Sequence, residues 1–189
     1  MRIVAATVVV AAFSFASAHE PEWTRHELFR GTIVLDAPPG WVAAPDPKGL
    51  NVMVRPAEPG DSRVLFSIPN PAFGDDVEGY LTANVRLIMD NLAQMGELRV
   101  VENRAQRFGD FNGHLIGFAV PLGGEDEMLF IALGFNAHGY CSMAMIMTPG
   151  SRIDEAGVYS HVVESMRYVP EKLREHADWL EEMAAAAGG

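Results

Sequence analysis

The side chains best suited to metal chemistry are gathered in the run "GYCSMAMIMTPG", residues 139–150. This run holds four sulfur-bearing residues at alternate positions: Cys141, Met143, Met145 and Met147. On a strand, alternate side chains lie on one face of the sheet. Because thiolate and thioether ligands select soft ions, one hypothesis is a Cu(I) site.

The spacing of these sulfur atoms argues against a shared ion. Same-face neighbours stand about 7 Å apart along a strand, whereas a metal holds its sulfur donors within about 2.3 Å. The second hypothesis, which we favour, is a core strand whose flexible methionines fill the space beneath a helix.

The histidines offer one further metal ligand. None of the six has the spacing of a catalytic zinc motif such as H-E-x-x-H. His19 becomes the first residue if the chain is cleaved after Ala18, and its amine and imidazole could then bind a copper ion together. The metal candidates are therefore Cys141, Met143, Met145 and His19, and the sequence predicts no metal or cofactor site outside them.

Motifs of covalent catalysis are missing from the sequence. There is no G-x-S-x-G and no S-x-x-K, and the glycines fit neither a dinucleotide nor a phosphate-binding loop. A nucleophilic Cys141 would need exposure and a lowered pKa, and a place in mid-strand argues against both. The sequence therefore predicts a protein that is not an enzyme. A hydrolase remains an alternative, because a triad of distant residues is recognised by geometry and not by order.

Alternation and turn signals divide the chain into elements that position these residues. Apolar residues at spacings of three and four predict a helix over 76–95, with Asp75 or Asp76 as its N-cap. A second helix is predicted over 154–166, and Pro170 suits the first turn of a third. The predicted strands cover 28–38, 51–57, 62–71, 98–108, 114–122, 128–135 and 140–148.

The connections between the predicted strands indicate how they pair. A turn at Glu58-Pro59-Gly60-Asp61 predicts a hairpin of the second and third strands. Asn112-Gly113 is a preferred pair for a two-residue hairpin turn, and the later connections are short as well. The order of elements predicts an α+β fold with a single antiparallel β-sheet and helices packed on it.

The N-terminus has the pattern of an export signal. One cation, Arg2, is followed by an apolar run and by Ala16-Ser17-Ala18, which predicts a signal peptide cleaved after Ala18 and a periplasmic or secreted protein. Loss of Arg2 leaves 13 cations against 25 anions, a net charge of 13 − 25 = −12. A field of this sign repels nucleic acid and anionic headgroups, and we do not expect nucleic acid as a partner. We also expect no transmembrane segment after cleavage, because the apolar run is shorter than the about 20 residues that span a bilayer and no second hydrophobic segment follows it.

Several segments together resemble the PsbP-like superfamily. They are "APPGW", "VEGYLTANVRLIMDNLAQM", "GDFNGHLIGFAV", "GYCSMAMIMTP" and "YSHVVESMRYV", and the resemblance covers about residues 28–169. It implies an α-β-α sandwich and a non-catalytic, accessory role through protein contacts. The chain departs from the photosystem member of that group, because "HEPEW" stands where a basic docking segment is expected.

These observations predict how the chain is organised and what it does. The predicted parts are a signal peptide (1–18), an N-terminal extension (19–27), a PsbP-like domain (28–169) and a C-terminal amphipathic helix with a frayed tail (170–189). That helix, which carries Trp179, docks either on its own domain or on a partner. The first functional hypothesis is an exported, acidic, non-catalytic binding or envelope-accessory protein that contacts another envelope protein or a small ligand. The alternatives are the hydrolase and the copper-binding protein.

Overall fold

The computed structural model of the chain describes residues 23–58, 60, 62–93, 97–108, 111–123, 126–151 and 156–187. In chain order the elements are β1 (Thr24–Leu28), β2 (Ile33–Ala37), β3 (Trp41–Pro45), β4 (Asn51–Pro56), β5 (Arg63–Ser67), η1 (Pro71–Phe73), α1 (Val77–Leu92), β6 (Arg99–Phe108), β7 (Phe111–Gly123), β8 (Asp126–Ala137), β9 (Tyr140–Pro149), α2 (Ala156–Glu164), β10 (Arg167–Tyr168), α3 (Pro170–Glu175) and α4 (Ala177–Ala187). The predicted signal peptide, with His19, lies outside the described residues.

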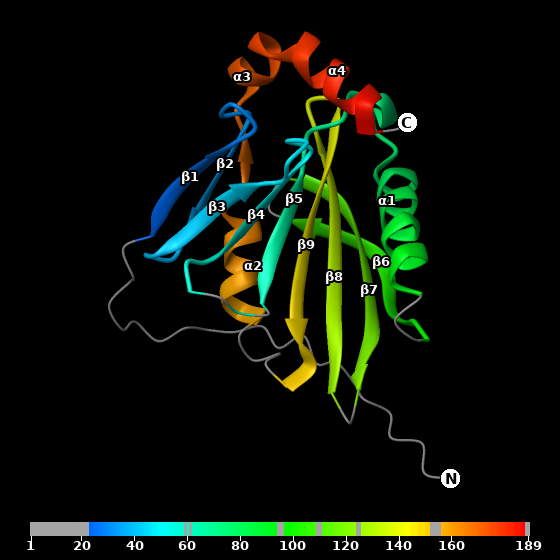
Figure 1. The fold of residues 1–189 in the computed structure, drawn as a ribbon. Coiled ribbons are helices and arrows are strands. Elements are labelled where there is room, and N and C mark those ends of the chain that lie inside the picture. Colours follow the sequence, from blue (N-terminus) through cyan, green and yellow to red (C-terminus); the bar gives the residue numbers. More distant parts are fainter. Residues whose placement is uncertain are drawn as a thin grey trace.

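The strands form two antiparallel sheets with helices packed on them, which confirms the α+β class (Figure 1). One sheet has the order β1-β2-β10 and the other the order β3-β4-β5-β9-β8-β7-β6. The expectation of a single sheet was therefore wrong. Pro38, directly after β2, has no N–H to extend the ladder, and Gly40 at φ 80° turns the chain into β3 of the other sheet.

The four-strand meander from β6 to β9 is present as predicted, but one of its turns is elsewhere. Phe108 pairs with Phe111, so the connection consists of residues 109–110, which lie outside the described residues. Asn112-Gly113 was expected to form this turn and instead belongs to β7. The ring of Phe111 packs within 6.2 Å of Phe135 and 5.9 Å of Tyr168, measured between ring centroids, and this packing keeps the start of β7 in the sheet.

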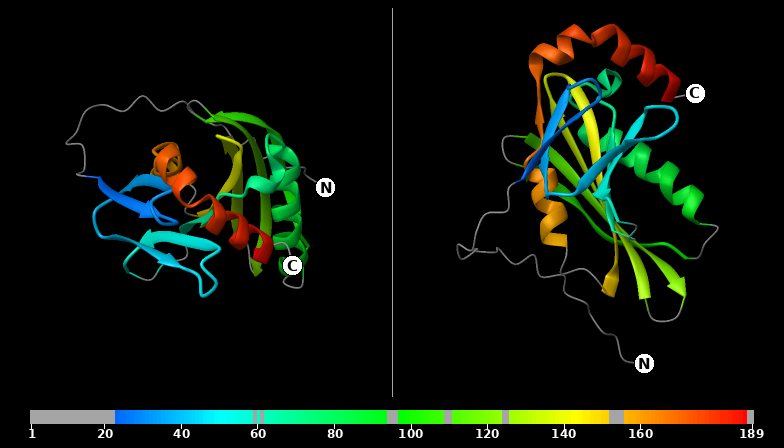
Figure 2. Two further views of the ribbon diagram at one scale, coloured as in Figure 1. Left: turned by 90° about the horizontal axis from the view of Figure 1, so that it is seen from above. Right: turned by 60° about the vertical axis from the view of Figure 1, so that its left-hand side comes forward.

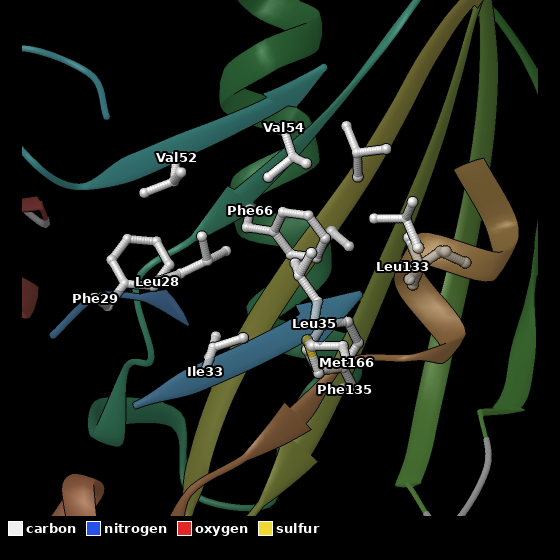
Figure 3. Close-up of a cluster of buried hydrophobic side chains, with 14 of the residues drawn as sticks. Leu28, Phe29, Ile33, Leu35, Val52, Val54, Phe66, Leu133, Phe135 and Met166 are labelled. Carbon is white, nitrogen blue, oxygen red and sulfur yellow. The ribbon is translucent and has the colours of Figure 1, made fainter. Parts of the chain in front are cut away.

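Two apolar clusters form the core, one on each side of the seven-stranded sheet. The first lies between the two sheets and α2, where the side chains labelled in Figure 3 point toward one another. The second lies beneath α1, which packs on β7, β8 and β9. The side chain of Asp76 accepts a hydrogen bond from the Gly79 N–H, which confirms the predicted N-cap of α1.

The C-terminal residues fold back on the domain. The predicted last helix is divided into α3 and α4 at His176, and both cross one end of the molecule (Figure 2). Leu173 and Leu180 are buried in the first core cluster. Trp179 of α4 packs under Arg30, whose guanidinium carbon lies 4.2 Å from the ring centroid. The C-terminal segment therefore docks on its own domain, which is one of the two alternatives considered from the sequence.

At the other end of the described chain, β1 (Thr24–Leu28) pairs with β2. Most of β1 belongs to residues 19–27, which were predicted to be an extension outside the domain, so that part of the extension is a strand of the fold. None of the helices in the described part of the chain has the length and apolar character needed to cross a bilayer.

Candidate functional site

The row of sulfur atoms on β9 faces α1. Cys141, Met143, Met145 and Met147 are all buried, and all belong to the second core cluster with Tyr80, Leu81 and Val85 of α1. The alternate residues Ala144 and Ile146 belong to the first cluster, so both faces of β9 are covered. This arrangement agrees with the core hypothesis, because a copper carrier needs its ligands within reach of solvent.

The thiol of Cys141 sits in a small polar environment at the end of this row. Its Sγ donates to the carbonyl oxygen of Gly74 at 3.3 Å, and the Asn136 amide donates both to that carbonyl and to Sγ, the latter at 3.7 Å. Burial raises the pKa of Cys141. The hydrogen bond from Asn136 lowers this pKa in part, and the nearby carboxylates of Asp76 and Asp75 raise it further. The thiol is therefore neutral at physiological pH, which suits neither a nucleophile nor a thiolate ligand.

A second polar group joins α1 to the sheet. The hydroxyls of Ser67 and Tyr80 are 2.6 Å apart, and Ser67 Oγ also accepts the Met143 N–H at 2.8 Å. Burial raises the pKa of Tyr80 to about 12. Both hydroxyls are thus used in holding the helix on the sheet.

The other polar residues considered from the sequence are dispersed. His114 Nε2 lies 2.6 Å from Asn103 Oδ1, His138 occupies a tight turn at φ 55°, and the His161 ring packs on Trp23. Trp41, on the edge strand β3, packs its ring 5.2 Å from that of Tyr159. Within the described residues, no group of three or more His, Cys, Asp or Glu side chains is placed to hold a metal ion.

A different surface stands out once the strands are in place: the outer face of β3, β4 and β5, meaning the face opposite the first core cluster. Because α1 packs on β7, β8 and β9, these three strands lie beyond its edge (Figures 1 and 2). The side chains on this outer face are those that alternate with the buried Val52, Val54, Val64 and Phe66: Val42, Ala44, Asn51, Met53, Arg55, Arg63, Leu65 and Ser67.

The outer face combines apolar and cationic groups on an acidic protein. Val42 is 36% exposed, and Met53 and Leu65 are half-buried. Arg55 and Arg63 are half-buried too, and the ion pairs within the described residues involve neither of them. A face that combines apolar side chains with cations that form no ion pair among the described residues is suited to binding.

Sequence reasoning missed this surface. The alternation in "NVMVRPA" and "SRVLFSIPNP" already places Arg55 and Arg63 on the same face as Met53 and Leu65. The sequence does not show where α1 lies on the sheet. In the structure α1 covers β7, β8 and β9 and leaves most of the outer face of β3, β4 and β5 uncovered.

Comparison with known proteins gives the fold. No protein-family model and no curated protein matches the sequence. Among solved structures, the cyanobacterial PsbP (CyanoP) of Synechocystis sp. PCC 6803 matches with a TM-score of 0.64 at 14% identity, over 84% of this chain and 99% of that one. The Ran-binding protein Mog1p of Saccharomyces cerevisiae matches with a TM-score of 0.54 at 10% identity, over 79% and 97%.

A protein of Bacteroides thetaiotaomicron is also similar, with a TM-score of 0.56 at 9% identity, over 77% of this chain and 48% of that one. These likenesses confirm the PsbP-like fold that the sequence segments had indicated. At such low identities they establish the fold alone.

Proposed function

We propose, from the PsbP-like fold of this chain and the open outer face of β3, β4 and β5, that it is an exported, non-catalytic binding protein with an accessory role in the cell envelope. Its partner is another protein, which it contacts through that face. The pattern of residues 1–18 supports export.

The observation that carries this proposal is the contrast between the two halves of one sheet face. Over β7, β8 and β9 the apolar side chains are buried under α1, whereas no helix of the described part of the chain covers Val42 of β3 and Met53 of β4. Leu65 of β5 lies at the margin, where it packs against the second core cluster and is still half-buried. Side chains of this kind gathered on one face of a monomer are typical of interaction sites. One of the similar structures, Mog1p, is described as a Ran-binding protein, and a role in protein contacts is in keeping with that example.

The two alternative functions receive less support. For a copper carrier, the sulfur row would have to leave the core to meet an ion. For a hydrolase, an activated nucleophile is needed, and the Ser62, Ser67 and Ser165 hydroxyls are engaged with Thr148, Tyr80 and backbone groups.

The proposal is tested by site-specific photo-crosslinking in the producing organism. A photoreactive amino acid is placed at Met53 on the outer face, and in a matched variant at Leu87, which is 62% exposed on α1. We expect a discrete crosslinked product with one polypeptide from position 53 and none from position 87. Equal crosslinking from both positions, or none from position 53, would contradict a binding role for this face.

A further inference from the structure

The two arginines of the outer face differ from every other arginine in the described part of the chain. Arg55 and Arg63 are half-buried, whereas the remaining arginines with described side chains are exposed. Partial burial of a charge is unfavourable unless an opposite charge or hydrogen-bond acceptors compensate it. A carboxylate partner within the described residues is found for neither, although the protein carries 25 acidic residues against 14 basic ones.

The register of β4 and β5 brings these two cations together. Met53 pairs with Leu65 and Val54 with Val64, which is the last pair of this ladder. If the register is continued by one position, Arg55 of β4 and Arg63 of β5 stand opposite each other on the face of Met53 and Leu65. Opposed residues on antiparallel strands have Cβ atoms about 5 Å apart, and like charges at such positions repel. The sheet therefore carries two like charges on neighbouring strands, and no ion pair among the described residues neutralises either of them.

The hydrogen-bonding capacity of both guanidinium groups is incompletely used. Nε of Arg63 is buried and has no hydrogen-bond partner in the described part of the chain. Arg55 directs Nη1 to the carbonyl oxygens of Pro56, at 2.9 Å, and Ala57, at 3.4 Å, and no other hydrogen bond of its side chain is recorded among the described residues. A bound carboxylate would offset the repulsion and accept hydrogen bonds from those guanidinium N–H groups that reach the surface, whereas Nε of Arg63 is buried and stays out of its reach.

Apolar side chains adjoin the cationic pair. Met53 and Leu65 stand next to the arginines along the same two strands, and Val42 lies opposite Arg55 on β3. A ligand that fits this arrangement carries carboxylates and apolar side chains in alternation along one extended face.

We propose that the outer face of β3, β4 and β5 binds an acidic polypeptide segment, whose carboxylates contact Arg55 and Arg63 and whose apolar side chains contact Met53, Leu65 and Val42. This inference rests on the proposed binding function and names the chemistry of the partner. The four residues at the centre of this site, Met53 and Arg55 on β4 and Arg63 and Leu65 on β5, lie on two adjacent strands. A site this narrow favours a short extended segment as the ligand over a large flat protein surface.

The test uses defined peptides and the full mature chain. The acidic probe is a fluorescein-labelled peptide Glu-Ser-Leu-Ser-Glu-Ser-Leu-Ser, which places glutamate and leucine on one face when extended. The neutral probe has glutamine in place of both glutamates. Fluorescence anisotropy is expected to give a Kd for the acidic probe at least about tenfold lower than for the neutral probe, with the difference shrinking as salt is added.

Variants assign the binding to the arginine pair. Arg55→Gln combined with Arg63→Gln should remove the preference for the acidic probe. The matched variant, Arg86→Gln combined with Arg167→Gln, changes the net charge equally at exposed positions and should leave the preference intact. Circular dichroism and thermal unfolding establish that both double variants fold. Equal affinity for the two probes, or equal loss in both double variants, would overturn the proposal.

Other partners give distinct results. Cosedimentation with phosphatidylcholine vesicles that contain phosphatidylglycerol, combined with no binding of the acidic probe, would identify an anionic membrane as the ligand and overturn the peptide proposal. If crosslinking from position 53 succeeds while the acidic probe fails to bind, the binding function stands and the proposed chemistry of the partner is wrong.

Discussion

The hydroxyl of Tyr80 on α1 lies 2.6 Å from the hydroxyl of Ser67 at the end of β5. Through Ser67, which also accepts the Met143 N–H, this contact links α1 to both β5 and β9. The link lies where the part of the sheet covered by α1 meets the open outer face. It therefore ties the first turn of α1 to the sheet at this boundary.

Removal of the Tyr80 hydroxyl should destabilise the fold. Tyr80→Phe loses a buried hydrogen bond and is expected to lower the free energy of unfolding by about 1 kcal/mol, as measured by urea denaturation. The control is Tyr168→Phe, because the buried Tyr168 hydroxyl makes no hydrogen bond of good geometry among the described residues, although the Ser142 hydroxyl is near enough to lower its pKa. Its removal is expected to be neutral or stabilising. The reverse order of the two effects would contradict the assigned roles.

Burial of Tyr80 should also make stability fall in alkali. Its pKa is raised from 10.0 to about 12 by burial, against a lowering effect of the Ser67 hydrogen bond. Between these values the unfolded chain has lost a proton that the folded chain retains. The contribution is thus fully present below pH 10 and is lost as the pH rises through 12, with a total of about 2–3 kcal/mol.

Tyr80→Phe is expected to show a shallower loss of stability than the parent protein between about pH 10 and pH 11 in urea titrations. Part of the dependence should persist, because burial also raises the pKa of Tyr168 well above its ordinary value. Identical pH dependence in the two proteins would refute the assignment.

The buried thiol should be inert in the folded protein. Because burial raises the pKa of Cys141 and closes access to it, modification by a disulfide reagent at neutral pH is expected to be at least about a hundredfold slower in the native state than in urea. The same protein should bind no stoichiometric Cu(I) in competition with a chelator. Rapid labelling of the native protein would instead support the soft-metal hypothesis.

Gly134 lets α1 approach β8 closely, and a side chain there should be harmful. A Cβ at this position would stand 3.0 Å from Leu81 Cβ and 3.2 Å from Val77 Cγ1. Gly134→Ala is expected to lower the free energy of unfolding by about 1–3 kcal/mol. Gly157→Ala is the control, since a Cβ there meets open space within α2, and it should stabilise the protein by up to about 1 kcal/mol. Stabilisation by both substitutions would show that α1 lies farther from the sheet.

The opposed arginines should weaken the unliganded fold. Arg63→Gln removes the repulsion with Arg55 and is expected to raise the free energy of unfolding by about 0.2–1 kcal/mol at low ionic strength. The gain should diminish as salt screens the repulsion. Thermal and urea unfolding of the parent and the variant, each at two salt concentrations, measure this. A destabilised variant would mean that Arg63 has a structural acceptor.

Local features of the fold could be predicted from particular residues. The alternation on β9 identifies two buried faces, Asp76 caps α1, and the short connection at His138-Gly139 forms a tight hairpin with both φ values positive. Each depends on neighbours within a few positions, where spacing and backbone preferences decide the outcome. The error at Asn112-Gly113 arose because packing of Phe111 in the core outweighed the turn preference.

The sequence by itself determined the acidic charge of the chain, most of its strands and helices, and the faces of those elements, because these depend on local periodicity and composition. It did not predict β1 or β3, and the strand predicted over 28–38 contains the turn at Phe29-Arg30-Gly31 that separates β1 from β2. Only the tertiary structure decided that β2 pairs with β1 and β10, and that α1 packs mainly on β7, β8 and β9 and meets the end of β5 through Tyr80 and Ser67. These contacts are between residues far apart in the chain, and many alternative strand pairings compete with the observed one, so local sequence does not decide among them. For the same reason, the opposed Arg55 and Arg63 become a candidate site only when the two strands that carry them are placed side by side.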